Sequence, residues 1–177
     1  MGGLRAGDLF AVRSSGFIGW AIRAVQWFWS TDNEAPYNHA GVITNDQGGT
    51  LESQWKYGKY KLDDYVGSRI LIARHKDMTK VRFIAGYDAV KKFIGCYYPV
   101  PRLILHLSKL AKFIPLGIGT CGEMTGKFMK GAGFKNIVYG LTPDDLADHW
   151  RIDRDMITVF EGTLTVDILK LLKEGVL

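Results

Sequence analysis

The hydrophobic residues of this chain follow two periods. Short apolar runs that are bounded by glycine or polar turn residues are typical of β-strands. Such runs occur at residues 8–13, 38–44, 50–54, 69–75 and 156–160. The second and third runs flank a five-residue loop with two glycines, which predicts a β-hairpin.

Other segments have the spacing of amphipathic helices, with apolar residues at i, i+3, i+4 and i+7. This spacing covers residues 17–29, 83–94 and 103–114. Helices are also expected over residues 121–130, after a Gly-rich loop, and over residues 166–173. Another helix start is marked by Thr142-Pro143-Asp144-Asp145, a capping residue followed by proline and acidic residues. The pattern predicts an α+β fold, with helices around a small antiparallel sheet.

Length and composition narrow this picture to one globular domain. The chain has 177 residues, of which 47% are hydrophobic and 23% charged, so intrinsic disorder and fibrous repeats are excluded. Arg5 and Asp8 interrupt the first ten residues, so no secretory signal is expected. Residues 14–31 carry a single charge, Arg23, but arginine in mid-helix disfavours a membrane span. We therefore expect a cytoplasmic protein or one that is carried in a phage particle.

The charge is concentrated in the middle of the chain. The net charge is +5, and residues 56–112 hold 13 Lys and Arg against 4 Asp and Glu. A basic region of this kind is either a solvated face or a surface for an anionic partner, such as lipid head groups or a cell-wall polymer. No helix-turn-helix, zinc-finger or RNA-binding signature accompanies it, so nucleic acid is not expected as a partner.

Cys121 is the first candidate for chemistry, because it stands where a helix is expected to begin. Backbone N–H groups at a helix N-terminus favour a thiolate and can stabilise an oxyanion beside it. The alternative is that Cys121 is a small buried hydrophobic residue, as most free cysteines are. Cys96 follows the apolar residues Phe93 and Ile94 and is interpreted as structural. Two cysteines are too few for a disulfide framework.

His39 is the candidate base, and Glu52 is the candidate residue that orients it. They are separated by 13 positions across the predicted hairpin, so paired strands would bring the carboxylate beside the imidazole. The alternatives are a hydrogen-bonded core histidine and an exposed glutamate at a sheet edge. Trp55 follows closely and is the aromatic residue that we expect near the substrate.

The sequence lacks the motifs of several other classes of enzyme and binding site. The chain contains no HExxH and no CxxC, so no metal site is expected. It contains no GxxxxGK[ST] motif, no strand-linked GxGxxG and no GxSxG, which argues against a nucleotide-binding enzyme and a serine hydrolase. No cofactor is therefore expected.

Five short motifs occur in one order along the chain: Gly7-Asp8-Leu9-Phe10, Asn38-His39-Ala40-Gly41-Val42, Leu51-Glu52-Ser53, Thr120-Cys121-Gly122-Glu123 and Thr142-Pro143-Asp144-Asp145-Leu146. In this order the chain resembles the circularly permuted branch of the NlpC-type, papain-fold cysteine hydrolases, in particular the YiiX-like proteins. The resemblance covers about residues 5–160. Each motif alone is weakly specific. The order of histidine, then glutamate, then a cysteine at a helix start is much more specific than any one of them.

The resemblance implies one permuted papain-like domain over residues 1–177, in which a helix carrying the cysteine packs on the sheet. It assigns Cys121 as nucleophile, His39 as general base and acid, and Glu52 as the residue that orients His39. Residues 99–120 are less typical of the family and are interpreted as an insertion or lid. The implied activity is a thiol hydrolase that cleaves an amide bond in a peptide or cell-wall stem peptide. The alternatives are a lipid acyltransferase, phospholipase or thioesterase at a membrane surface, and a binding module without catalysis.

Overall fold

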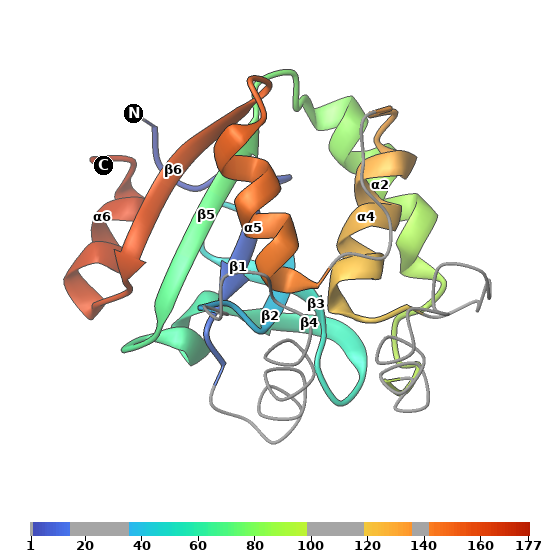
Figure 1. The fold of residues 1–177 in the computed structure, drawn as a ribbon, viewed down its shortest axis with the longest axis horizontal. Coiled ribbons are helices and arrows are strands. Elements are labelled where there is room, and N and C mark those ends of the chain that lie inside the picture. The colour runs from blue at the N-terminus through green and yellow to red at the C-terminus, as the bar shows by residue number, and fades with distance from the viewer. Residues whose placement is uncertain (1, 15–35, 99–118, 136–141) are drawn as a thin grey trace.

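The computed structural model describes residues 2–14, 36–98, 119–135 and 142–177. These residues contain a six-stranded antiparallel sheet in the order β4-β3-β2-β1-β5-β6, with helices on both of its faces (Figure 1). The strands are β1 (Leu9–Val12), β2 (His39–Ile43), β3 (Gly49–Ser53), β4 (Tyr57–Lys61), β5 (Arg69–His75) and β6 (Met156–Thr163). The predicted α+β class and small antiparallel sheet are confirmed.

Four α-helices and one short 3-10 helix surround the sheet in the described ranges. They are α2 (Lys80–Lys91), α4 (Cys121–Gly131), α5 (Pro143–Ile152), α6 (Val166–Glu174) and the 3-10 helix η1 (Leu62–Tyr65). Helices α2, α4 and α5 share the first face of the sheet, whereas α6 and η1 lie against the second face.

The strands divide their side chains between two hydrophobic cores. On β1, Leu9 and Ala11 point to the first core, and Phe10 and Val12 point to the second. This alternation is the period of two that a pleated strand imposes. All four strand residues are fully buried, so the sheet separates two dry layers and is exposed on neither face at this position.

The predicted hairpin is present between β2 and β3. Its loop closes through the side chain of Asn45, whose oxygen accepts the backbone N–H groups of Gln47 and Gly49 at 3.0 and 2.9 Å. Gly48 has a φ of 77°, a value that favours glycine. The resulting register pairs Gly41 with Glu52, which decides where the Glu52 side chain lies.

Close packing between α2 and α4 depends on Gly86. A Cβ atom at this position would lie 2.8 Å from the ring of Phe128 on α4, closer than real side chains approach. Without a side chain at Gly86, Phe128 enters the first core and ties α4 to α2. The absence of a side chain at Gly86 therefore sets how closely the two helices approach each other.

Two elements were not predicted, and both ends of α2 and the end of β6 differ from the expected bounds. Strand β4 is a lysine-rich edge strand interrupted by Gly58, and η1 is a single turn; neither has a clear periodic signature. Helix α2 begins three residues earlier than expected, because the Thr79 hydroxyl caps it by accepting the Arg82 N–H at 3.3 Å. It also ends at Lys91, three residues before the expected Ile94.

The helices expected over residues 17–29 and 103–114 lie outside the described residues. The same holds for the insertion expected over residues 99–120, apart from Gly119 and Thr120. None of the helices in the described ranges is both long and apolar enough to cross a lipid bilayer.

Candidate active site

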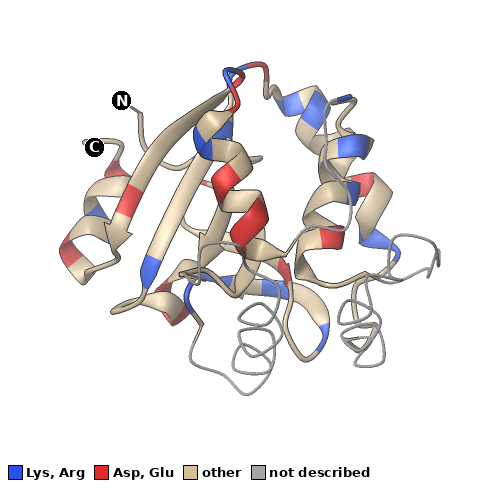
Figure 2. Cartoon of the chain, in the orientation of Figure 1, with Lys and Arg blue, Asp and Glu red and all other residues tan. Residues whose placement is uncertain are grey.

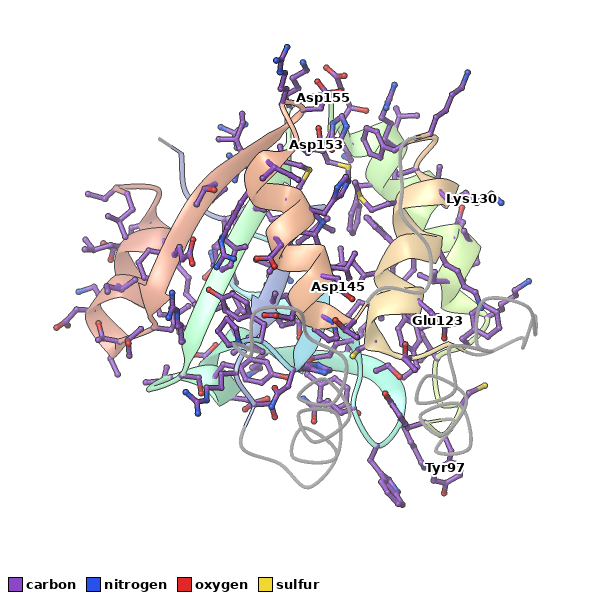
Figure 3. All side chains as sticks on the ribbon, viewed as in Figure 1. Tyr97, Glu123, Lys130, Asp145, Asp153 and Asp155 are labelled. Carbon is purple, nitrogen blue, oxygen red and sulfur yellow. The ribbon has the colours of Figure 1, made fainter. Side chains whose placement is uncertain are left out.

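Cys121 is the first residue of α4, as the sequence predicted. Thr120 precedes it in an extended conformation, and its backbone N–H donates to the carboxylate of Glu123 at 2.8 Å. Glu123 lies on the first turn of the helix (Figure 3). The thiol is buried, with 1% of the residue exposed. The backbone N–H of Glu123 donates to the Thr120 side chain, which completes a capping box. The N–H groups of Cys121 and Gly122 precede the first hydrogen bond of the helical ladder and point toward the space next to the sulfur.

His39 is the first residue of β2, and both residues before it are held in place. The side chain of Asn38 exchanges two hydrogen bonds with the backbone of Ser14, at 2.7 and 2.8 Å. The backbone N–H of Tyr37 donates to Asp144 on α5 at 3.3 Å. These contacts fix the point at which the chain enters the strand, and the imidazole of His39 is buried.

The hairpin brings Glu52 beside His39. Glu52 lies opposite Gly41 on the neighbouring strand, and His39 lies two residues before Gly41 on the same face of the sheet. A Cβ atom on Gly41 would lie 2.8 Å from the Cβ of Glu52, so glycine leaves the space that Glu52 occupies. The Nε2 atom of His39 and the Oε2 atom of Glu52 are 2.5 Å apart.

The imidazole joins Glu52 to Cys121. Burial alone would lower the pKa of His39, but side-chain hydrogen bonds with Cys121 and Glu52, and the charges of both groups, raise the pKa of His39 to about 10. Because Nε2 faces Glu52, the ring presents Nδ1 to the thiol. The three predicted residues therefore form one continuous line of side chains from different elements: α4, β2 and β3.

Burial also acts on Glu52, which is 1% exposed. It would raise the pKa of the Glu52 carboxyl, but hydrogen bonds from His39, Thr50 and Tyr65 and the charge of His39 outweigh it and lower the pKa. Thr50 Oγ1 donates to Oε1 at 2.5 Å, and the hydroxyl of Tyr65 donates to Oε2. Glu52 is thus held as an ionised acceptor.

Tyr98 places a hydroxyl near the thiol. The residue is 5% exposed, and its hydroxyl has no hydrogen-bond partner of ordinary geometry among the described residues. Burial, then the nearby charges of Cys121 and Glu123, raise the pKa of Tyr98 well above its usual range. The hydroxyl therefore keeps its proton and remains a donor next to the sulfur.

Trp55 lies on the surface next to this tyrosine. Its backbone oxygen accepts the N–H of Tyr98 at 2.9 Å, and its side chain is 62% exposed. The adjacent pair is Lys56 and Tyr97, which form an isolated β-bridge. Tyr97 points out of the molecule (Figure 3), with the Lys56 ammonium 4.6 Å from its ring centre.

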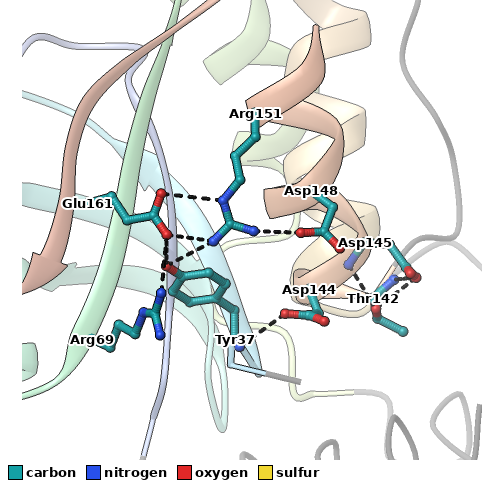
Figure 4. A network of polar contacts seen from close by, with 8 residues as sticks. All are labelled: Tyr37, Arg69, Thr142, Asp144, Asp145, Asp148, Arg151 and Glu161. Carbon is teal, nitrogen blue, oxygen red and sulfur yellow. Dashed lines mark hydrogen bonds and ion pairs between the residues drawn. The ribbon is translucent and has the colours of Figure 1, made fainter. Parts of the chain in front are cut away.

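A polar network supports the site from α5 and β6 (Figure 4). Arg151 donates to Glu161 at 2.6 Å and to Asp148 at 2.5 Å, and Glu161 accepts the hydroxyl of Tyr37 at 3.0 Å. Asp144 on the same helix accepts the backbone N–H of Tyr37. Both ends of Tyr37 are therefore fixed two residues before His39.

The remaining candidates lie elsewhere. Cys96 is half-buried in the turn after α2, and its backbone pairs with Tyr57. His75 is half-buried, and its ring packs on that of Phe134 with 3.8 Å between ring centres. His149 pairs with Asp153 on α5 at 3.6 Å, and His106 lies outside the described residues.

Thr50, Tyr65 and Tyr98 were missed as site residues by sequence reasoning. Thr50 had a usable signal, because it stands two positions before Glu52 in a predicted strand and so shares its face. Tyr65 comes from η1, and Tyr98 follows the turn after α2. No local pattern connects either tyrosine to the site.

No family model and no curated protein matches the sequence, so the comparison rests on solved structures. Five chains of solved structures match. One is the crystal structure of the metalloprotein YiiX from Escherichia coli O157:H7, assigned to DUF1105, with a TM-score of 0.51. This chain has the fold of YiiX. The match covers 89% of this chain and 97% of YiiX at 14% identity, so it shows the fold alone.

YiiX itself is described as a metalloprotein. Among the described residues of this chain, no group of three His, Cys, Asp or Glu side chains is arranged to hold a metal ion. His39 and Glu52 direct their facing atoms at each other. These residues do not fit a metal centre, and we derive no catalytic step through a metal ion.

Proposed function

We propose that this chain is a cysteine hydrolase of the permuted papain-like, NlpC-type kind, which cleaves an amide bond through an acyl-enzyme. The observation that carries the proposal is the buried line of side chains Cys121, His39 and Glu52. The YiiX fold supports it, because the family that the motif order resembles includes the YiiX-like proteins. Cys121 acts as nucleophile, His39 as general base and acid, and Glu52 orients the ring.

The reaction has two halves. In the first, His39 holds the thiol proton, the sulfur of Cys121 attacks the carbonyl carbon, and a C–S bond forms. His39 then gives its proton to the leaving nitrogen, and the C–N bond breaks to leave a thioester. In the second half, His39 takes a proton from water, the hydroxide attacks the thioester, and the acid is released with the thiol restored.

The oxyanion of each tetrahedral intermediate needs donors in fixed positions. The backbone N–H of Cys121 at the start of α4 is one donor in this proposal. The hydroxyl of Tyr98 is the second, because it is buried beside the sulfur and no other described residue pairs with it. An unpaired buried hydroxyl is unfavourable in the resting protein, and an oxyanion would satisfy it.

The substrate is proposed to be a peptide or a cell-wall stem peptide. Trp55 would contact it, since its ring is exposed and its backbone pairs with that of Tyr98. The basic residues gathered along α2 favour an anionic polymer (Figure 2). A lipid ester is the second candidate, because exposed Trp55 and Tyr97 beside Lys56 combine aromatic and cationic groups, as at membrane interfaces.

The first test measures the alkylation of both cysteines by iodoacetamide between pH 5 and 9, read by mass spectrometry. We expect Cys121 to react faster than Cys96 even at pH 6, and His39→Ala to slow it about tenfold or more, because the imidazolium no longer stabilises the thiolate. His149→Ala is the matched control and should leave the rate unchanged. Equal, slow rates for both cysteines, without dependence on His39, would favour the binding module.

The same protein then decides between substrates. The protein is incubated with a mixture of peptide amides in one experiment and with phospholipid vesicles in another. The acyl adduct on Cys121 is detected by its mass in each case. An adduct from the peptide supports the amide hydrolase. An adduct from the lipid alone would transfer the proposal to the acyltransferase or phospholipase.

A further inference from the structure

The Glu52 carboxylate is held by more donors than orientation of one imidazole requires. Oε2 accepts from His39 and from the hydroxyl of Tyr65, whereas Oε1 accepts from Thr50 at 2.5 Å. Since both oxygens are tied, the carboxylate cannot rotate without breaking a hydrogen bond. This arrangement favours one oxygen, Oε2, as the atom that faces His39.

This carboxylate lies in an unfavourable place for a charge. It points to the second core, where Phe10, Val12, Ile43 and Ile70 are fully buried. A buried carboxylate without partners takes up a proton instead of remaining charged. If Glu52 did so, it would lose the charge that holds His39 as imidazolium.

The position of Tyr65 opposes protonation of Glu52. Its ring packs 5.8 Å from that of Phe10 and 6.0 Å from that of His39, measured between centres. Its hydroxyl accepts from Gln54 at 3.1 Å and therefore directs its own proton to Glu52. Burial, then the charge of Glu52, raise the pKa of Tyr65 above its usual value, so the hydroxyl stays a donor.

We propose that Tyr65, together with Thr50, is a positioning residue that keeps Glu52 ionised and aligned on Nε2 of His39. Neither residue touches the reacting atoms; both act through Glu52. The turn η1 then has a function, because it delivers Tyr65 to the site from outside the hairpin. This inference rests on the proposed function only where it connects the charge of His39 to the reactivity of Cys121.

A merely structural role is the competing explanation: Glu52 would satisfy two hydroxyls that are buried for other reasons. The two roles differ in the charge of Glu52. In the structural case, removing a hydroxyl changes stability and leaves the carboxyl titration where it was. In the positioning case, each lost donor makes the carboxylate easier to protonate.

The test titrates Glu52 directly by carbon-13 NMR of the full chain labelled at the glutamate carboxyl carbon. The chain has five glutamates, and Glu52→Gln identifies the signal. The variants are Tyr65→Phe, Thr50→Val and both together. Tyr60→Phe is the matched control, because the Tyr60 hydroxyl bonds to the backbone oxygen of Lys56. Thr50→Ser restores the hydroxyl and should restore the wild-type titration.

We expect the Glu52 signal to titrate at higher pH in Tyr65→Phe and in Thr50→Val, and higher still in the double variant. Cys121 alkylation at pH 6 should fall several-fold in the same variants. An unchanged titration in both single variants or an equal change in Tyr60→Phe would overturn the inference. If Cys121 alkylation depends on His39 in the wild type, a moved titration with unchanged alkylation would overturn it as well. If Tyr65→Phe does not fold, the Thr50 pair decides. If wild-type Cys121 reacts independently of His39, the proposed function fails, and the titration still decides the role of Tyr65.

Discussion

The imidazole of His39 lies between two acceptors, and this placement widens the pH range over which it keeps its proton. The pKa of His39 rises from an ordinary 6.5 to about 10, while that of Glu52 falls below its ordinary 4.5. A histidine whose pKa is higher in the folded than in the unfolded chain stabilises the fold when protonated. Its contribution is complete below pH 6.5 and is lost as the pH rises toward 10.

Glu52 behaves in the opposite sense, because its stabilising contribution is present above pH 4.5 and is lost as the pH falls below that value. The pair therefore stabilises the fold most between about pH 4.5 and 6.5. We expect the melting temperature of the wild type to fall more between pH 6 and 9.5 than that of His39→Gln. The difference should be a few degrees, since about 1 kcal/mol corresponds to roughly 2–4 °C in a chain of this size.

The measurement is thermal unfolding followed by circular dichroism at both pH values. His149→Gln, on α5, serves as the control and should melt with the wild-type pH dependence. Parallel curves for the wild type and His39→Gln would show that His39 has the same proton affinity in the folded and unfolded chains.

At the scale of elements, α5 connects the first core to the start of β2. Its N-terminus is marked in the sequence by Thr142 and Pro143, and the cap is formed as expected, with the Asp145 N–H donating to the Thr142 hydroxyl at 3.2 Å. The acid just before it in the sequence, Asp144, is buried and accepts the backbone N–H of Tyr37. One short motif therefore both starts a helix and anchors the strand that carries His39.

This anchoring predicts a difference between two acids of α5. Asp144→Ala leaves the Tyr37 N–H without that acceptor inside the protein, which should cost about 1–3 kcal/mol of unfolding free energy. It should also slow Cys121 alkylation, because His39 is two residues away. Asp148→Ala removes an exposed ion pair with Arg151 and should cost under about 1 kcal/mol. Urea unfolding and alkylation of both variants provide the check, and equal effects would refute the anchoring role.

The elements that could be predicted are those with a local cause. The β2–β3 hairpin follows from the glycines of its loop, the start of α4 from the loop before Cys121, and that of α5 from its cap. Strand β4 could not be predicted, because an edge strand with alternating exposed lysines has little apolar pattern. Tyr65 and Tyr98 reach the site through packing between distant segments, which no spacing in the sequence encodes.

At the scale of the whole molecule, the candidate site joins the two cores. Cys121 belongs to a helix on the first face of the sheet, whereas Glu52 points to the second, and His39 at the end of β2 connects them. Charge is also unequal among the helices, since α2 carries three basic residues and one acid, whereas α5 carries three acids and one arginine (Figure 2). Because Cys121 and Glu52 lie on opposite faces of the sheet, the thiol faces its base only when both cores are formed.

The two ends of the described chain lie close together (Figure 1). The backbone N–H of Leu4 donates to the oxygen of Leu172 at 3.0 Å, and Gly3 packs against Gly175. A linker of a few glycines would join them while leaving every strand pair of the sheet intact. New ends could then be made between Tyr98 and Gly119.

We expect this rearranged chain to fold and to keep the His39-dependent alkylation of Cys121, because all partners of the sheet remain on one polypeptide. Circular dichroism and the alkylation assay are the measurements, and a soluble but unfolded product would contradict the expectation. In such a gene the codon for the cysteine would precede that for the histidine, although the folded surfaces were the same. The order of these two candidate residues along the gene would then record only where the polypeptide is opened, while the sheet preserves their positions in space.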